Sequence, residues 1–322
     1  MRSVTHRKPT IQDVAVVGTG VIGRSWIVVF ARAGCRTHVY DANSKQLQKA
    51  LAWLEQNLEF NRKDGFISAK GIREIRGRIT PHSDLDQALR GVGYVQESGP
   101  ERIELKQKLF AKLDQLAKPG TILASSTSGL DMTEIAAGLE GANRCIVAHP
   151  VNPPHIIPVV EVLPGKKSDA GVVKRTATFL KSVLQKPVLM NCYVKNFLLN
   201  RMQAALIREA IQLVEHGVAD VDAVDTVIRD GLGLRWALMG PFGVANTNAD
   251  GGVREYLTRY REAYIEGMND LYPTPSLDQA MIERLGRATD RMLGHMSRVK
   301  VRRWRDRMIR KIRGLKEENR PS

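Results

Sequence analysis

The sequence predicts an α/β fold with a doubly wound, mainly parallel sheet, followed by an all-helical C-terminal domain. Three observations support this. Short β-branched runs alternate with helical patterns as far as about residue 190. A glycine-rich turn joins the first run to a helix, as in Rossmann-type dinucleotide-binding folds. From Asn196 onward the strand signals stop and helical periodicity takes over. We therefore expect two domains, residues 1–193 and 194–322.

The glycine-rich turn is the most informative motif. It follows a buried strand expected over 14–17 and leads into a helix that extends to about residue 33. Gly18 permits a tight turn, Gly20 lets the backbone approach a diphosphate, and Gly23 lets the helix pack closely on the strand. The diphosphate then lies at a helix N-terminus, where free N–H groups favour negative charge.

A second strand, expected over 37–40, ends in Asp41. A carboxylate at this position accepts hydrogen bonds from the ribose hydroxyls of NAD and repels the 2′-phosphate of NADP. No arginine follows Asp41 directly, so the cofactor we expect is NAD. The alternative interpretation is a structural glycine turn beside a surface aspartate, and the surrounding strand and helix signals make it the weaker one.

The remaining elements follow in chain order. Residues 45–78 are expected to form a helical segment, which is longer than a simple connection between two neighbouring strands requires. Further strands are expected over 94–97, 121–124, 144–148, 159–162 and 187–190. A long helix is expected over 197–218, and a second helical run over 221–229 leads to a glycine-rich hinge at 231–233.

Composition excludes several classes of protein. With 43% hydrophobic and 26% charged residues, the chain of 322 residues is an ordinary globular sequence. No apolar stretch approaches the roughly 18 residues of a membrane span. The three cysteines lack metal-ligand spacing, so we expect buried thiols, no metal, and a reducing compartment, the cytoplasm.

The net charge of +15 is concentrated near the C-terminus, in a basic segment over 298–313. Apolar residues recur within it at steps of three and four, which favours an amphipathic helix with a solvated basic face. Steering of anions and binding of nucleic acid are the less favoured interpretations. We expect neither a membrane nor a nucleic-acid partner.

Candidate catalytic residues follow the later strands, because ligands bind at the carboxyl ends of strands in such sheets. They are the segment Ser125–Ser128, His149 after the strand 144–148, and Glu161 in the next strand. Oxidation of an alcohol needs a base, for which the pKa of histidine is suited, and a carboxylate on the other ring nitrogen fixes its tautomer. The alternatives are a structural histidine, an ordinary ion pair and a helix cap.

These motifs carry a resemblance to a known family. The chain resembles the 3-hydroxyacyl-CoA dehydrogenase superfamily, and within it the branch of lambda-crystallin and L-gulonate 3-dehydrogenase. The resemblance extends from about Val14 to Leu315. It rests on the segments 18–26, 96–101 with Lys106, 125–128, 148–154, 199–203 and 231–236.

The resemblance implies roles for individual residues. It implies that His149 is the general base, that Glu161 pairs with it, and that Ser128 and Asn200 hydrogen-bond the substrate oxygen, with Asn152 as a further polar position nearby. The implied NAD contacts are Val21, Ile22, Asp41, Glu101 and Lys106. It also implies a homodimer formed through the helical domain. One departure is Asn196, where relatives usually have glycine.

The substrate implied is a small free hydroxy acid, such as L-gulonate, because Arg235 has the planar fork that suits a carboxylate. Arg235 pairing with an internal acid is the competing interpretation. Three other functions stay open: short-chain 3-hydroxyacyl-CoA oxidation, carnitine 3-dehydrogenation, and a crystallin-like structural role.

Overall fold

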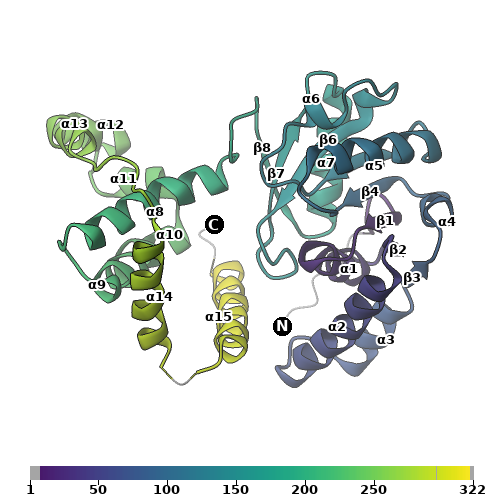
Figure 1. The fold of residues 1–322 in the computed structure, drawn as a ribbon, viewed down its shortest axis with the longest axis horizontal. Helices are drawn as coiled ribbons and strands as arrows, with labels where there is room; N and C mark the ends of the chain where they lie inside the picture. The colour runs from purple at the N-terminus through teal and green to yellow at the C-terminus, as the bar shows by residue number, and fades with distance from the viewer. Residues whose placement is uncertain (1–7, 295, 320–322) are drawn as a thin grey trace. The chain divides into compact units, whose positions relative to one another are not determined.

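The computed structural model describes residues 8–294 and 296–319. The chain divides after Arg201 into two compact units, an α/β unit and a helical unit (Figure 1). The domain boundary expected after residue 193 stays a prediction. Among the described residues, no helix is both long and apolar enough to cross a membrane.

The α/β unit is built on one sheet, whose register brings the strand ends of the candidate site to one edge. Its strands are β1 (Asp13–Val17), β2 (Arg36–Tyr40), β3 (Ile79–His82), β4 (Tyr94–Glu97), β5 (Ile122–Ser125), β6 (Cys145–Pro150), β7 (Val159–Pro164) and β8 (Lys186–Leu189). They lie in the order β3-β2-β1-β4-β5-β6-β7-β8. β6 and β7 pair antiparallel, whereas the other neighbouring pairs are parallel.

This topology confirms the predicted doubly wound, mainly parallel sheet. The chain builds outward from β1 to β2 and β3, and then returns to the other side of β1 with β4. The strand order therefore reverses between β1 and β4, and ligands of such sheets bind outside the strand ends at this point. The edge strand β3 was not predicted from the sequence.

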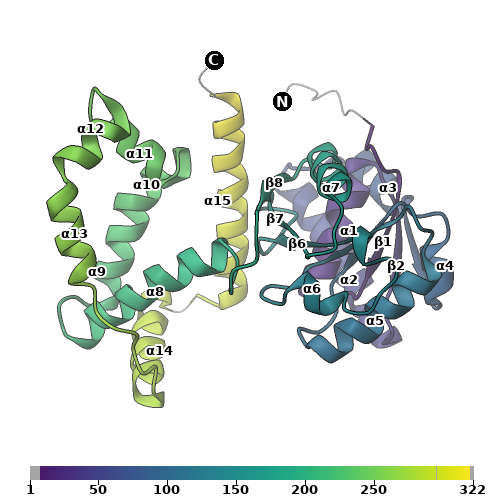
Figure 2. The same ribbon diagram turned by 90° about the horizontal axis from the view of Figure 1, so that it is seen from above.

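Helices cover both faces of the sheet. The helical elements of this unit are α1 (Val21–Ala33), α2 (Ser44–Lys63), α3 (Ala69–Arg76), α4 (Leu85–Leu89), α5 (Ile103–Leu116), α6 (Met132–Ile135), η1 (Ala142–Arg144) and α7 (Ala170–Ser182). One apolar core joins α1, α2, α3 and α7 to the sheet, and a second joins α4, α5 and α6 to the other face. Figure 2 shows α7 on one side of the strands and α5 and α6 on the other.

Buried β-branched and aromatic side chains hold these layers together. Val14, Val16 and Val39 point into the first core, where they meet the fully buried Trp26 and Phe30 of α1. The two aromatic rings stack with their centroids 5.1 Å apart. The helix α1 is therefore anchored along its length, which fixes the position of its N-terminus at the end of β1.

The helical unit begins within α8 (Leu199–Glu215). Its further elements are α9 (Val221–Thr226), η2 (Val227–Leu232), α10 (Gly233–Leu238), α11 (Pro241–Thr247), α12 (Gly252–Arg259), α13 (Arg261–Asn269), α14 (Gln279–Leu293) and α15 (Arg298–Glu318). The predicted hinge at 231–233 is wrong. A single π-helical turn, η2, carries the backbone without a break from α9 into α10.

The basic C-terminal segment is helical, as predicted, and forms α15. Its packing is less complete than the sequence suggested, since Trp304, Ile312 and Leu315 are exposed. Near its end, Lys316 donates a hydrogen bond to the carbonyl oxygen of Ala237, at the end of α10.

Candidate active site

The turn between β1 and α1 has the geometry that its glycines predict. Gly18 has a positive φ of 90°, and a Cβ added there would lie 2.8 Å from the carbonyl carbon of Ser98. A Cβ on Gly23 would overlap the carbonyl oxygen of Gly18, so the helix and the turn touch through backbone alone. In contrast, a Cβ on Gly20 would meet no described atom within 4 Å.

The start of α1 fits a diphosphate. Gly20 is its N-cap and gives no side-chain hydrogen bond, so the first-turn N–H groups, including those of Val21 and Ile22, are left for a ligand. Val21 is also 54% exposed, although it lies in an otherwise apolar segment. An open Cβ position and uncapped donors together are what a bound dinucleotide requires.

Asp41 lies directly beside this turn. Its Oδ2 accepts hydrogen bonds from the backbone N–H and the hydroxyl of Thr19, at 2.7 and 2.8 Å. Its Oδ1 accepts from the backbone N–H of Asn43, at 2.9 Å. These bonds fix the half-buried carboxylate at the end of β2, and Oδ1, which accepts one bond, keeps a lone pair for a ribose hydroxyl.

His149 and Glu161 form a buried pair. They are directly opposite one another in the antiparallel ladder of β6 and β7. The His149 Nδ1 lies 2.7 Å from the Glu161 Oε2, and the two side chains are 7% and 2% exposed. The sequence prediction that these two residues come together is confirmed by this geometry, whereas their catalytic role stays a prediction.

Glu161 also accepts two backbone hydrogen bonds. The N–H groups of Leu198 and Leu199 both donate to its Oε1 at 2.8 Å. Burial by itself raises the pKa of this carboxyl, but the hydrogen bonds from His149 and from the two backbone N–H groups outweigh it and hold the pKa below its usual value. Glu161 is therefore an ionised acceptor that links β7 to the beginning of α8.

The second nitrogen of the imidazole has the freedom that a base needs. Within the described part of the chain, no group hydrogen-bonds the His149 Nε2. The ring meets the edge of the fully buried Phe197, with centroids 5.5 Å apart. The carboxylate on one side and the phenyl ring on the other fix the orientation of the imidazole.

Ser128 and Asn200 are brought together, although they are 72 positions apart. The Asn200 Nδ2 donates to the backbone oxygen of Ser128 at 3.4 Å. Asn200 follows Leu199 directly, so the bond from Leu199 to Glu161 places the backbone at Asn200 close to the imidazole pair. Asn152, by comparison, is exposed in the loop after β6.

The other two implied cofactor contacts, Glu101 and Lys106, meet around a residue that the sequence left without a role. The ammonium of Lys106 is 2% exposed and lies 2.8 and 2.9 Å from the two carboxylate oxygens of Glu97. It is 3.6 Å from Glu101, whose Oε1 accepts from Thr127 and from the backbone of Ser128. The sequence signal for the Glu97–Lys106 pair is the glutamate at the end of the buried strand 94–97, because a buried carboxylate needs a positively charged partner.

The remaining residues of the serine-rich segment bond inward. Ser125 donates to Glu97 at 2.6 Å, and Ser126 accepts from Trp26 and Gln96 at 3.2 and 2.7 Å. Of this segment, Ser128 is the exposed member. The segment is therefore chiefly a buried support for the loops around the sheet edge.

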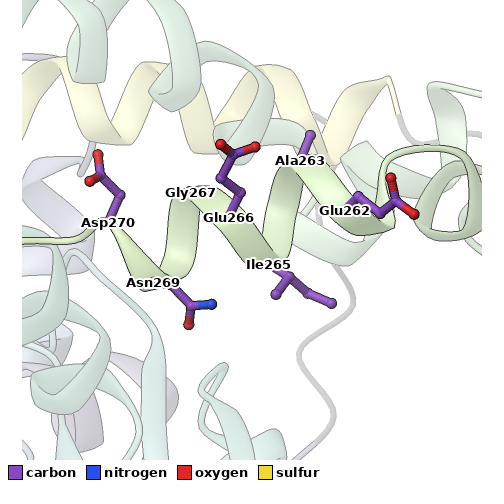
Figure 3. A pocket seen from close by; sticks show the side chains of 7 residues that line it. All are labelled: Glu262, Ala263, Ile265, Glu266, Gly267, Asn269 and Asp270. Carbon is purple, nitrogen blue, oxygen red and sulfur yellow. The ribbon is translucent and has the colours of Figure 1, made fainter.

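Arg235 belongs to the helical unit, where it is exposed on α10. The same unit has a hollow of about 970 Å³ along α13, shown in Figure 3. Glu262, Glu266 and Asp270 line it, so its charge repels an anionic hydroxy acid. Among the described residues, no three His, Cys, Asp or Glu side chains gather as a metal site requires.

The sheet, the glycine turn and the imidazole pair define a class of protein, an NAD-dependent oxidoreductase that acts on a CH–OH group. Comparisons with known proteins identify the family. The model of the 3-hydroxyacyl-CoA dehydrogenase NAD binding domain matches residues 13–193, and that of the C-terminal domain matches residues 197–293. The chain belongs to the 3-hydroxyacyl-CoA dehydrogenase family.

Relatives span nearly the whole chain. The lambda-crystallin homolog of Bos taurus is 38% identical over 308 residues, which are 95% of this chain and 96% of the relative. An L-carnitine dehydrogenase of Oceanobacillus iheyensis is 34% identical over 258 residues, 79% of this chain and 81% of the relative. The solved structure of 5-formyl-3-hydroxy-2-methylpyridine 4-carboxylic acid 5-dehydrogenase, an NAD+ dependent dismutase, has a TM-score of 0.80 at 26% identity and covers 96% of this chain and 99% of its own.

Proposed function

We propose that this protein oxidises the 3-hydroxyl group of L-gulonate, or of a similar small hydroxy acid, with NAD as the hydride acceptor. The observation that carries the proposal is the buried pair of His149 and Glu161 at the end of β6, with the His149 Nε2 left free of hydrogen bonds from the residues that the structure describes. Such a nitrogen accepts a proton from an alcohol near neutral pH.

The chain's own residues then have separable tasks. NAD held at the glycine turn would supply the hydride acceptor for this oxidation. The His149 Nε2 takes the hydroxyl proton, and Glu161 stabilises the imidazolium that forms. Ser128 and Asn200, which are in contact, hold the substrate oxygen during this change, and Asn152 adds a further polar group nearby.

The cofactor contacts follow from the turn and the strand ends. Gly18, Gly20 and Gly23 shape the diphosphate turn, the N–H groups of Val21 and Ile22 receive the diphosphate, and Asp41 binds the adenosine ribose. Glu101 and Lys106, which lie 3.6 Å apart beside the loop after β4, would make further contacts with NAD.

A free acid, and not an acyl-CoA, is the substrate class that we favour. Arg235 supports this choice, since a guanidinium binds a carboxylate in a bidentate way. Arg235→Met is expected to reduce kcat/KM for hydroxy acids at least about tenfold and to spare their methyl esters. Equal losses for acids and esters would remove Arg235 from substrate recognition.

The decisive experiment is NADH formation with L-gulonate, carnitine, 3-hydroxybutyrate and 3-hydroxybutyryl-CoA, followed by the absorbance of NADH. We expect the highest kcat/KM with L-gulonate. A preference for carnitine would move the substrate to a trimethylammonium hydroxy acid, and a preference for the thioester would refute the free-acid assignment.

His149→Gln tests the base. Turnover is expected to fall at least about a thousandfold, because the proton has no acceptor, while the dissociation constant of NADH stays within about twofold. Retained turnover would exclude His149 as the base. Loss of NADH binding would show instead that the residue supports the fold.

We further propose a homodimer formed through the helical unit. Its support is the number of large apolar side chains that this unit exposes, among them Phe242 at 80%, Leu238 at 70% and Met202 at 64%. Sedimentation at micromolar concentration is expected to give a species of twice the chain's 35.9 kDa. A monomer under these conditions would refute the proposal.

A further inference from the structure

Arg24 lies just beyond the dinucleotide turn and has its guanidinium held in one place. It follows Gly23 directly and lies in the first part of α1. Its guanidinium carbon is 4.5 Å from the centre of the Trp53 ring on α2, which is a cation–π contact. The Nε atom is buried. Stacking and burial therefore determine where the charge lies.

This charge has no counter-ion among the residues that the structure describes. Among residues 8–294 and 296–319, no carboxylate pairs with Arg24, and its buried Nε has no hydrogen-bond acceptor. Arg36 and Arg144, in the same unit, each have an aspartate within 2.7 Å. Burial without a partner lowers the pKa of the Arg24 guanidinium, so its position costs folding free energy.

The position of Arg24 relative to the site suggests what compensates this cost. Its backbone N–H donates to the carbonyl oxygen of Gly20, so it lies one helical turn beyond the diphosphate turn. Helix side chains lean toward the N-terminus, which directs the guanidinium to that turn. On its other side, Trp53 meets the edge of the His155 ring at 5.7 Å, in the loop after the His149 strand.

We propose that Arg24, held against Trp53, binds an oxyanion at the active site. Two sources present this chemistry there: the diphosphate of NAD and the carboxylate of the hydroxy acid. The second source rests on the function proposed above, whereas the first rests only on the NAD site. A planar guanidinium that is already ordered binds such a group with little loss of side-chain entropy.

The test compares Arg24→Met with Arg73→Met. Arg73 is an exposed arginine on α3 and serves as the matched control for loss of one positive charge. NADH binding is measured by titration of the free protein, and binding of L-gulonate by calorimetry on the NADH complex. We expect Arg24→Met to weaken one of these at least about tenfold, and Arg73→Met to change neither by more than about twofold.

The pattern of loss identifies the source of the oxyanion. Weaker NADH binding assigns Arg24 to the diphosphate, and weaker L-gulonate binding with unchanged NADH binding assigns it to the carboxylate. Trp53→Phe keeps an aromatic face and is expected to retain most of the affinity. If both affinities of Arg24→Met match those of the control, the proposal is overturned.

A stability measurement separates binding from a structural role. Because the unpaired charge is a cost in the free protein, the midpoint of thermal unfolding of Arg24→Met is expected to equal or exceed that of the unsubstituted chain. A lower midpoint together with unchanged binding would make Arg24 a structural residue. Failure of the proposed function is distinguishable, since it appears as absent turnover of the unsubstituted protein with NADH binding intact.

Discussion

Replacing Glu161 with glutamine changes which nitrogen of His149 carries the proton, while the shape of the side chain at position 161 stays the same. The Oε1 of Glu161 accepts from the two N–H groups of Leu198 and Leu199, and Oε2 faces the Nδ1 of His149. Glutamine has a single side-chain oxygen, and this oxygen accepts the hydrogen bonds from the N–H groups of Leu198 and Leu199. Its NH₂ group then faces Nδ1, so the neutral imidazole carries its proton on Nε2, the nitrogen proposed as the base.

The magnitude follows from these three hydrogen bonds. Bonds to a charged group contribute about 1.5–3 kcal/mol and neutral ones about 0.5–1.5, so three bonds lose roughly 3 kcal/mol in total. Relief from burying the charge of Glu161 offsets part of this loss. The free energy of unfolding of Glu161→Gln is therefore expected to fall by about 1–3 kcal/mol near neutral pH.

The effect on turnover is larger, because the wrong tautomer removes the base. In other histidine–carboxylate pairs the equivalent amide substitution reduces kcat about 10⁴-fold. We expect a loss of about 10³–10⁴-fold for Glu161→Gln, with NADH affinity nearly unchanged. Glu140→Gln, an exposed position with no described side-chain contact, is the matched control and is expected to retain activity.

The dependence on pH has a definite sign. Because the pKa of Glu161 is lowered in the folded state, its contribution to stability is fully present above its ordinary value of 4.5. The contribution is lost as the pH falls through the lower, folded value. The stability difference between the unsubstituted protein and Glu161→Gln is therefore expected to be constant above about pH 6 and to shrink in acid.

Urea unfolding at several pH values and steady-state NADH formation measure these effects. The reasoning is refuted if Glu161→Gln keeps more than about a tenth of the turnover, since a correct tautomer would then not depend on the carboxylate. A stability difference that grows in acid would equally contradict the lowered pKa of Glu161.

Three further predictions concern the cofactor turn and the thiols. Asp41→Ala is expected to raise kcat/KM with NADP relative to NAD at least about tenfold, because a repelling charge is removed, and an unchanged ratio would exclude the ribose contact. Gly23→Ala is expected to cost about 3 kcal/mol or more in urea unfolding, since its Cβ overlaps a backbone oxygen, and a loss below about 1 would contradict this close approach. Burial raises the pKa of Cys35 and Cys145 to about 12, so a thiol reagent is expected to label only the exposed Cys192 in the native protein, and rapid labelling of a second thiol would show otherwise.

The sequence predicted the strands that consist of buried apolar runs, together with the largely exposed β8, and missed β3. The strand β1 has four fully buried apolar residues in succession, which leave little ambiguity. The strand β3 is short and half exposed, and it contains Pro81, which removes a backbone donor. An edge strand of this kind has no periodic pattern to detect.

The start of the long helix was predicted two residues too early. Asn196 and Phe197 have positive φ values of 68° and 52°, so α8 begins only at Leu199. Asparagine, at the first of these positions, tolerates the left-handed conformation. The apolar Phe197 matched the helical period, but its ring packs against His149 instead.

The sequence analysis also left strand direction open, because an apolar run has the same pattern in either direction. The antiparallel pairing of β6 with β7 is what places Glu161 directly opposite His149. A parallel strand would have needed a crossover helix, and the short connection from 151 to 158 leaves no room for one. The twelve-residue separation of His149 and Glu161 therefore indicates a contact between them only once β6 and β7 are recognised as an antiparallel hairpin.

This hairpin also explains why one carboxylate controls two parts of the site. Glu161 binds His149 through one oxygen and, through the other, the backbone just before Asn200. The base and the amide proposed to hold the substrate oxygen are therefore positioned by the same side chain. A substitution at Glu161 is expected to disturb both the proton transfer and the substrate contact, whereas one at His149 removes the proton transfer alone.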